Sequence, residues 1–374
     1  MIANFLSLFL LLVTFIFPSY NTDIDRAINH LYNFQISKSI DTLDSISIEY
    51  PEDPLIPFLR ISAYWQYSLL NDSPESSYEI INKGIEEAVP FYIDMIKKHP
   101  NNQRYNLFLG SLYGLRARVN LARSEWMNLV ISGTKGFKYI SDAIKNDPLL
   151  YDAYMPIGTL EYFLCRSSST LQMIGGVFGI KSDCQEAIDK LEIASSRAEY
   201  SWVESRNVLS YIYLYIERDY RKAYENSHSL SESFPGHPFF LYLEAESLTK
   251  LREYEKLDQI NSMLVDFYEE GPLNQKLECY DKYLYLNALR SFQEGKYEIA
   301  IKFSSEVINN YDIEFQWLLG YAYLIRGKSI ELSGNRSDAI PDYKEAVKYL
   351  DNYPDKGDAR ALILSPISEI SESK

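Results

Sequence analysis

The sequence predicts an all-α fold, a right-handed α-solenoid in which antiparallel helical hairpins stack one on the next. Three observations carry this prediction. Apolar residues recur at i, i+3, i+4 and i+7 along most of the chain, which is the helical period. Asn-Gly and Asp-Gly, the strongest β-hairpin signals, do not occur. One helical-hairpin pattern also repeats, and because a single hairpin cannot bury its apolar face alone, stacking must supply the core.

The composition narrows the class of protein. The 374 residues are 46% hydrophobic and 24% charged, as in folded soluble domains. Asp and Glu number 52 against 37 Lys and Arg, which gives a net charge of −15. Nucleic-acid backbones repel so acidic a chain, and we expect no nucleic-acid partner. The 32 tyrosines either pack in half-buried positions or form a recognition surface.

Residues 1–20 read as an N-terminal export signal or anchor. Residues 2–17 form one uncharged apolar run, followed at once by Pro18 and a short polar stretch. The run is shorter than the roughly 20 residues of a spanning helix and suits the apolar part of an export signal. We expect export to the periplasm or cell envelope, with an uncleaved membrane anchor as the alternative. Membrane contact is then expected only through this segment, if it stays uncleaved.

Residues 21–150 form irregular hairpins. One hairpin is indicated by Ala27, Ser39, Leu43 and Pro51. Residues 54–100 and 103–148 then form pairs of longer helices. These pairs exceed the period of about 34 residues that typifies the repeat.

Residues 151–360 carry the clearest repeats. Small residues recur where the two helices of a hairpin must cross closely, because a larger side chain would push the helix axes apart. They are Gly158, Ala187, Ala223, Ala300, Gly327 and Ala339. Gly295 and Gly334 end first helices in left-handed caps, and proline stops second helices, as at Pro235. Residues 361–374 are expected to form a short polar tail.

These residues and spacings resemble the tetratricopeptide repeat. More narrowly, residues 105–240 resemble an exported, functionally uncharacterised bacterial group of such proteins. The resemblance implies a solenoid fold and an exported location, and no known activity. It also places six residues on the inner, concave face as a candidate partner-binding groove: Tyr162, Tyr215, Tyr285, Phe292, Tyr321 and Lys328.

An apolar insertion at residues 166–183 interrupts the repeats. Its apolar side chains either pack back onto the solenoid, which we expect, or form an interaction element. Cys165 and Cys184 flank it and are able to pair in an oxidising compartment. The alternative is that these two and Cys279 are three small buried hydrophobes.

Motifs of catalysis are missing. The sequence has no HExxH pair and no G-x-S-x-G elbow. The glycines before Lys181 fail the phosphate-loop pattern, because no Gly directly precedes that Lys. The arginines from Arg104 to Arg123 are expected to pair with the abundant acids. We therefore expect no catalytic residues, no cofactor and no metal.

The sequence favours a non-enzymatic scaffold that binds a protein or peptide partner in the cell envelope. The alternative is a carrier of a lipid or small apolar ligand in the solenoid interior. That carrier needs a closed apolar cavity lined by residues such as Met155, Phe163, Met173 and Phe178. An enzyme with a catalytic unit hidden in residues 54–183 ranks third.

Overall fold

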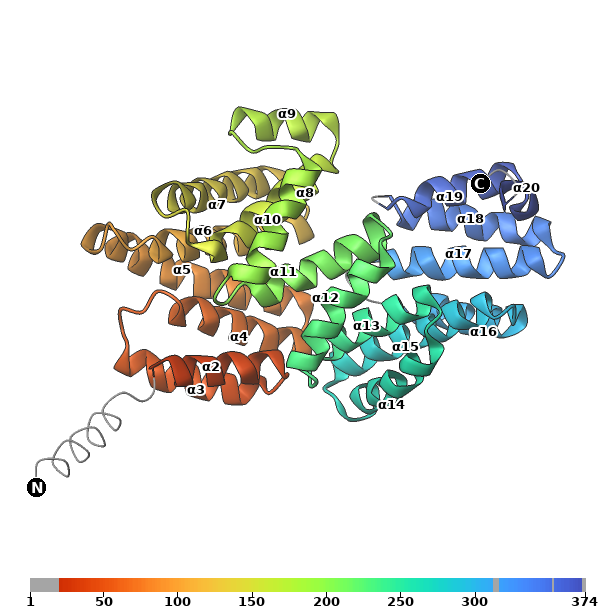
Figure 1. Cartoon of the computed structure of the whole chain (residues 1–374), viewed down its shortest axis with the longest axis horizontal. Coiled ribbons are helices and arrows are strands. Elements are labelled where there is room, and N and C mark those ends of the chain that lie inside the picture. The colour runs from red at the N-terminus through yellow and green to blue at the C-terminus, as the bar shows by residue number, and fades with distance from the viewer. Residues whose placement is uncertain (1–19, 312–315, 352, 372–374) are drawn as a thin grey trace, which may run out of the picture.

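The computed structural model describes residues 20–311, 316–351 and 353–371 of the chain. Within these ranges every regular element is helical and no strand occurs, which confirms the predicted all-α solenoid (Figure 1). The export signal predicted in residues 1–20 lies almost wholly outside the described residues. None of the described helices is long and apolar enough to cross a membrane.

Eight antiparallel hairpins follow one another in the described chain, each with a first and a second helix. The first helices are α2 (Tyr20–Tyr32), α4 (Ile56–Asn71), α6 (Arg104–Ala122), α8 (Tyr154–Cys165), α11 (Trp202–Tyr211), α13 (Pro238–Leu251), α15 (Leu273–Gln293) and α17 (Trp317–Leu332). The second helices are α3 (Ile36–Glu49), α5 (Pro74–Lys98), α7 (Trp126–Asn146), α10 (Cys184–Arg197), α12 (Tyr220–Ser233), α14 (Tyr254–Glu270), α16 (Tyr297–Asn310) and α18 (Arg336–Tyr349). The shorter elements are η1 (Tyr151–Ala153), α9 (Ser169–Val177), the π-helical turn η2 (Ile212–Ile216), α19 (Asp355–Leu364) and α20 (Ile367–Ser371).

Close helix crossings occur where the small residues predict them. A Cβ atom added to Gly158 on α8 would lie 2.9 Å from the carbonyl oxygen of Ala187 on α10. One added to Gly327 on α17 would lie 2.7 Å from the Tyr343 ring on α18. These glycines therefore set the helix separation within hairpins four and eight.

The turns inside the hairpins share one conformation that the sequence shows only in part. Gly295 and Gly334 have positive φ, as predicted. Four residues other than glycine take the same left-handed conformation at other hairpin turns: Phe34, Ser124, Arg218 and Arg252. After Phe34, Ser124 and Arg252 the next residue's N–H bonds to the carbonyl five residues back, as in Glu125 N–H to Asn120 at 2.8 Å. This is the Schellman cap that ends a helix.

The solenoid turns tightly enough for its first hairpin to meet its fifth and sixth. The backbone N–H of Gly236, between α12 and α13, donates to the Asn33 side chain at 3.0 Å. The Tyr32 hydroxyl donates to Glu204 on α11 at 3.0 Å, and its ring lies 5.1 Å from that of Phe234. The first helices of hairpins one to six therefore enclose a first interior space.

A second closure joins the fifth hairpin to the chain that follows the eighth. The hydroxyls of Tyr211 and Tyr353 are hydrogen-bonded, with ring centroids 6.4 Å apart. Arg218, at the turn after η2, pairs with Asp355 at 3.3 Å and Asp358 at 2.9 Å. The first helices of hairpins five to eight therefore enclose a second interior space.

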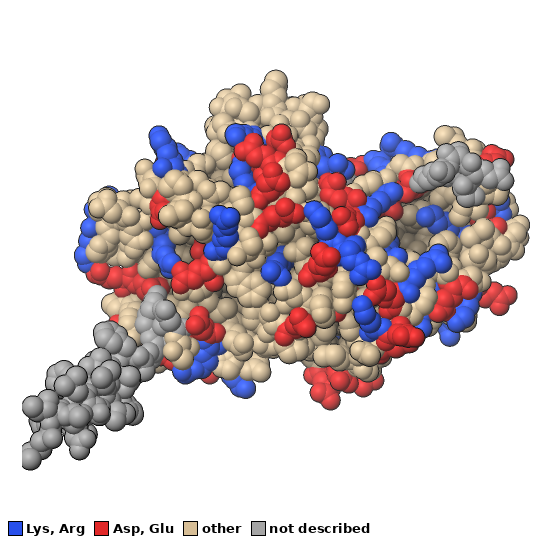
Figure 2. All heavy atoms as spheres, viewed as in Figure 1, with Lys and Arg blue, Asp and Glu red and all other residues tan. Residues whose placement is uncertain are grey.

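The insertion at residues 166–183 projects from the body as α9 (Figure 1). Its predicted packing onto the solenoid is wrong for most of its apolar side chains: Met173 is 67% exposed, Val177 79% and Phe178 50%, whereas Ile180 is buried. Residues 167–180 contain no charge, and the projecting end shows none in the view of Figure 2. Helix α9 thus presents apolar side chains to solvent.

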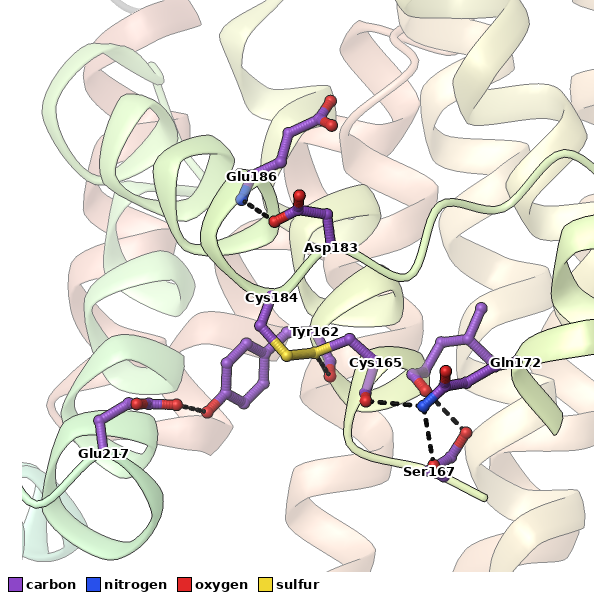
Figure 3. The surroundings of a disulfide bond; sticks show 9 residues. Tyr162, Cys165, Ser167, Gln172, Asp183, Cys184, Glu186 and Glu217 are labelled. Atoms are coloured by element: carbon purple, nitrogen blue, oxygen red, sulfur yellow. Dashed lines mark hydrogen bonds between the residues drawn. A yellow bond between two sulfur atoms is a disulfide. The ribbon is translucent and has the colours of Figure 1, made fainter. Parts of the chain in front are cut away.

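A disulfide between Cys165 and Cys184 fixes the base of this insertion (Figure 3), with Cα atoms 5.5 Å apart. Gln172 on α9 donates to the carbonyls of Cys165 at 2.9 Å and Ser167 at 3.0 Å. Asp183 accepts from the Glu186 N–H at 3.0 Å and caps α10. These contacts hold the ends of the insertion without covering its apolar side chains.

Part of residues 361–374, which the sequence predicts to be a short polar tail, is helical. Helix α19 ends at Leu364, and Leu362 is buried. The side chain of Arg336 on α18 donates to the Leu362 carbonyl at 3.0 Å. Helix α19 therefore covers the last hairpin, which would otherwise leave an apolar face exposed.

Candidate binding site

The first interior space holds a cavity of about 400 Å³, hereafter the inner cavity. Only first helices and the short segments before them line it, from hairpins one to six. Helical spacing places its residues on one face of each helix, as with Phe58, Ser62, Trp65 and Leu69 on α4. The other apolar and aromatic lining residues are Leu31, Tyr32, Leu55, Leu59, Leu107, Phe108, Leu115, Met155, Pro156, Tyr200 and Phe240. This size and lining are typical of a small-ligand pocket.

One carboxyl in the inner cavity is held by neutral groups alone. Glu204 on α11 accepts from the Tyr32 hydroxyl at 3.0 Å and from the Asn207 amide at 3.4 Å. It forms no ion pair with any described residue. Desolvation raises the pKa of Glu204 above its ordinary value. The cavity wall therefore carries an acidic group that has lost solvent without gaining a cation.

The other titratable residues of the cavity have structural roles. Asp152 accepts from the backbone N–H groups of Tyr200 at 2.8 Å and Ser201 at 2.7 Å, which fixes the chain that enters α11. His237 caps α13 by accepting from the Phe240 N–H at 3.3 Å. Burial, with a smaller contribution from nearby Lys282, lowers the pKa of His237 to about 3. His237 is therefore neutral at physiological pH.

Trp65 lines the cavity with its aromatic side chain. Its indole Nε1 is buried and has no hydrogen-bond partner among the described residues. The guanidinium of Arg118 lies over its ring, 4.8 Å from the centroid. A buried donor without an acceptor is costly to the folded state.

The second interior space contains a cluster of aromatic rings. This tyrosine cluster consists of Tyr211, Tyr215, Tyr242, Tyr285, Trp317, Tyr321 and Tyr353. At its centre Glu246, fully buried, accepts from the hydroxyls of Tyr215 at 2.5 Å, Tyr242 at 2.8 Å and Tyr285 at 3.2 Å. Desolvation raises the pKa of Glu246 and of all three tyrosines. Three donors satisfy this carboxyl, so the cluster is a closed packing unit.

The structure brings together three of the six predicted groove residues. Tyr215, Tyr285 and Tyr321 lie in the tyrosine cluster, with centroids of Tyr285 and Tyr321 6.3 Å apart. All three rings are buried, as core packing requires. Their role in binding a partner stays a prediction.

The other three lie apart from one another. Tyr162 is buried in α8 and donates to Glu217 at 2.5 Å (Figure 3). Phe292 is partly buried on α15, 6.1 Å from the Tyr297 ring. Lys328 is partly exposed on α17, and desolvation lowers its pKa.

The residues that the carrier hypothesis named are also separated. Met155 lines the inner cavity. Phe163, Met173 and Phe178 are exposed and do not line it, so they were wrongly assigned. Sequence reasoning missed Glu204 and Trp65, although the repeated inner-face positions on α4 and α6 gave a usable signal.

The predicted pairing with acids is confirmed for three of the four arginines between Arg104 and Arg123. Arg104 pairs with Glu199, Arg123 with Glu75, and Arg116 lies 3.8 Å from Glu86. Within the described ranges no group of three or more His, Cys, Asp or Glu could hold a metal ion.

No family model matches the sequence, and no curated protein matches it. Among solved structures the chain is similar to yeast Tom70, at 10% identity over 90% of this chain and 87% of that one, with a TM-score of 0.33. The human IFIT1 dimer with PPP-AAAA is 13% identical, over 83% of this chain and 78% of that one, with a TM-score of 0.33. The TPR domain of P58(IPK) is 13% identical, over 95% of this chain and 99% of that one, with a TM-score of 0.26.

These likenesses are remote, and the assignment of the fold rests on the chain's own geometry. Small residues at the crossings, Schellman caps at the turns and inner-facing first helices recur from hairpin to hairpin. The protein is an all-helical solenoid of tetratricopeptide-like hairpins.

Proposed function

We propose that the protein is a non-enzymatic scaffold that binds a polypeptide segment through the inner cavity. The observation that carries the proposal is the inner cavity, which leaves about 400 Å³ free beside aromatic walls. A preformed concave site with aromatic anchors binds a ligand at low reorganisation cost.

The polar groups of the inner cavity favour a polypeptide ligand. Gln66 and Asn207 supply side-chain amides. Amide groups pair with both the N–H and the C=O of a peptide backbone. A polypeptide segment therefore complements the cavity: its backbone pairs with the few polar side chains, and its apolar side chains pack against the many apolar ones.

A small apolar ligand is the second candidate. The inner cavity has the volume of a small-ligand pocket, and Met155 lines it as the carrier hypothesis required. Native mass spectrometry of the purified chain distinguishes the two. A bound lipid or other small molecule that leaves on denaturation supports the carrier.

We also propose that the chain is exported to the cell envelope, in keeping with its resemblance to an exported bacterial group. The disulfide between Cys165 and Cys184 supports this location, because disulfides persist in oxidising compartments and are rare in the cytosol. The uncharged run of residues 2–17 supports it independently. A fusion of residues 1–30 to a reporter that is active only outside the cytoplasm tests export.

A cavity-filling substitution tests the binding site. Ser111 lines the inner cavity from α6, and its hydroxyl bonds only to its own helix, at the Leu107 carbonyl. Ser111→Phe should fill part of the cavity and weaken binding of peptides selected on the wild-type chain by tenfold or more. Ser233→Phe on the exposed end of α12 is the matched control and should leave binding unchanged. Equal binding by wild type and Ser111→Phe contradicts the proposed site.

A further inference from the structure

The carboxyl of Glu204 differs from three other interior carboxyls of the described chain. Glu161 is paired with Lys190, and Glu331 with Arg336 at 2.8 Å. Glu246 has three tyrosine donors. Glu204 has one tyrosine hydroxyl and one long amide contact, and it lines a cavity rather than a packed core.

The basic groups near the inner cavity do not neutralise Glu204. His237 lines the cavity but caps α13, and burial keeps it neutral. Arg118 lies over the Trp65 ring. Arg206, on the same helix as Glu204, donates to the Ser195 carbonyl and lies over Trp202. Glu204 therefore has no cationic partner among the described residues, and a cation carried by a bound ligand would have this carboxylate to pair with.

The walls around this acid suit a cation on an apolar stem. Tyr32, Phe58, Trp65, Phe108 and Tyr200 all line the cavity. Aromatic faces attract ammonium and guanidinium groups, and this attraction grows when the cation is desolvated. Lys and Arg bury their aliphatic stems on apolar surface while keeping the charged head on a polar partner. The net charge of −15 also draws a basic segment toward the molecule.

We propose that the inner cavity accepts a basic side chain, Lys or Arg, of the partner polypeptide. Its cationic group pairs with Glu204, and its stem lies against the aromatic wall. This inference rests on the proposed function, since it names the chemistry of the segment that the cavity binds. It makes Glu204 the residue that selects basic segments over neutral and acidic ones.

Selection from a random peptide library on the full-length, disulfide-bonded chain tests the inference. We expect the enriched peptides to share a Lys or Arg beside apolar residues. Replacing that Lys by norleucine, which keeps the stem and removes the charge, should weaken binding to the wild-type chain at least tenfold in calorimetry. Glu204→Gln keeps an acceptor for the Tyr32 hydroxyl and should bind both peptides with equal, weak affinity.

Glu225→Gln is the matched control, because it removes the same charge from an exposed position on α12. It should preserve the preference for the Lys peptide. If the selected peptides are blocked by Ser111→Phe but carry no basic residue, or if norleucine binds as tightly as Lys, the inference is overturned and the proposed function stands. If Ser111→Phe blocks no selected peptide, the proposed function itself fails.

Discussion

Tyrosine has two different uses at the residue scale in this protein. In the second interior space, Tyr215 and Tyr285 fill volume and direct their hydroxyls to the buried Glu246. In the first, Tyr32 and Tyr200 line a free cavity. The sequence alone does not separate these uses, because the four tyrosines lie on first helices or close to one in sequence and differ in what the curvature of the solenoid brings opposite them.

Removing one ring from the tyrosine cluster should destabilise the fold. Tyr321 is 4% exposed and donates to Asp355 at 2.9 Å. Tyr321→Ala should lower the free energy of unfolding by about 3–5 kcal/mol, as for other large aromatic residues in cores. Tyr321→Phe keeps the ring and should cost only about 1 kcal/mol. Urea unfolding measures both, and an unchanged midpoint for Tyr321→Ala would show that the ring is not core.

Glu204→Gln should stabilise the protein in a pH-dependent way. Desolvation raises the folded-state pKa of Glu204, so the folded chain holds the proton more tightly than the unfolded chain. Stability from this group is therefore lost as pH rises from the unfolded value, about 4.3, through the raised folded value. Gln does not titrate, so the variant should be more stable than wild type at pH 7.5.

At pH 4 the carboxyl is largely protonated in both states, and the advantage of Glu204→Gln should shrink. Urea unfolding of both chains at the two pH values checks this. An equal difference at pH 4 and pH 7.5 would mean that the charge of Glu204 has no cost in the folded state.

At the element scale, local sequence rules predict the hairpins but not the insertion. Gly158 and Gly327 mark close crossings because nothing larger fits there. The sequence did not predict the left-handed turns at Arg218 and Arg252, because Arg has no intrinsic preference for positive φ. The sequence also did not predict that the apolar side chains of α9 are exposed, because an apolar sequence normally indicates burial.

Two glycine substitutions separate a packing role from helix propensity. Gly158→Ala places its Cβ 2.9 Å from the Ala187 carbonyl oxygen and should cost about 1–3 kcal/mol through overpacking. Gly176→Ala on α9 meets no atom within 4 Å and should be neutral or stabilising by about 0.5–1 kcal/mol. Thermal unfolding followed by circular dichroism compares them. Equal effects from the two substitutions would contradict the close crossing of α8 and α10.

Loss of the disulfide should loosen the insertion. The bond closes a loop with a sequence separation of 19, for which chain-entropy arguments give about 2–4 kcal/mol. The double variant Cys165→Ser/Cys184→Ser should unfold at lower urea and be cleaved by protease within residues 166–183. Wild type treated with reductant should behave in the same way. Unchanged urea and protease sensitivity would show that α8 and α10 alone hold the loop.

At the scale of the whole molecule, the central feature is that the solenoid closes on itself twice. Gly236 meets Asn33 across 203 positions of sequence, and Tyr211 meets Tyr353 across 142. The repeats predicted an all-α solenoid, but these closures depend on small rotations summed over four or five hairpins, which no local pattern encodes. For the same reason the sequence did not show which helices would line the inner cavity.

The structure of a complex between the full chain and a selected basic peptide tests this account most directly. The account predicts a Lys or Arg of the peptide in the inner cavity, paired with Glu204 and flanked by Trp65 and Phe108, with the tyrosine cluster unchanged. A peptide bound outside the inner cavity, or one that opens the tyrosine cluster to reach Glu246, would contradict it.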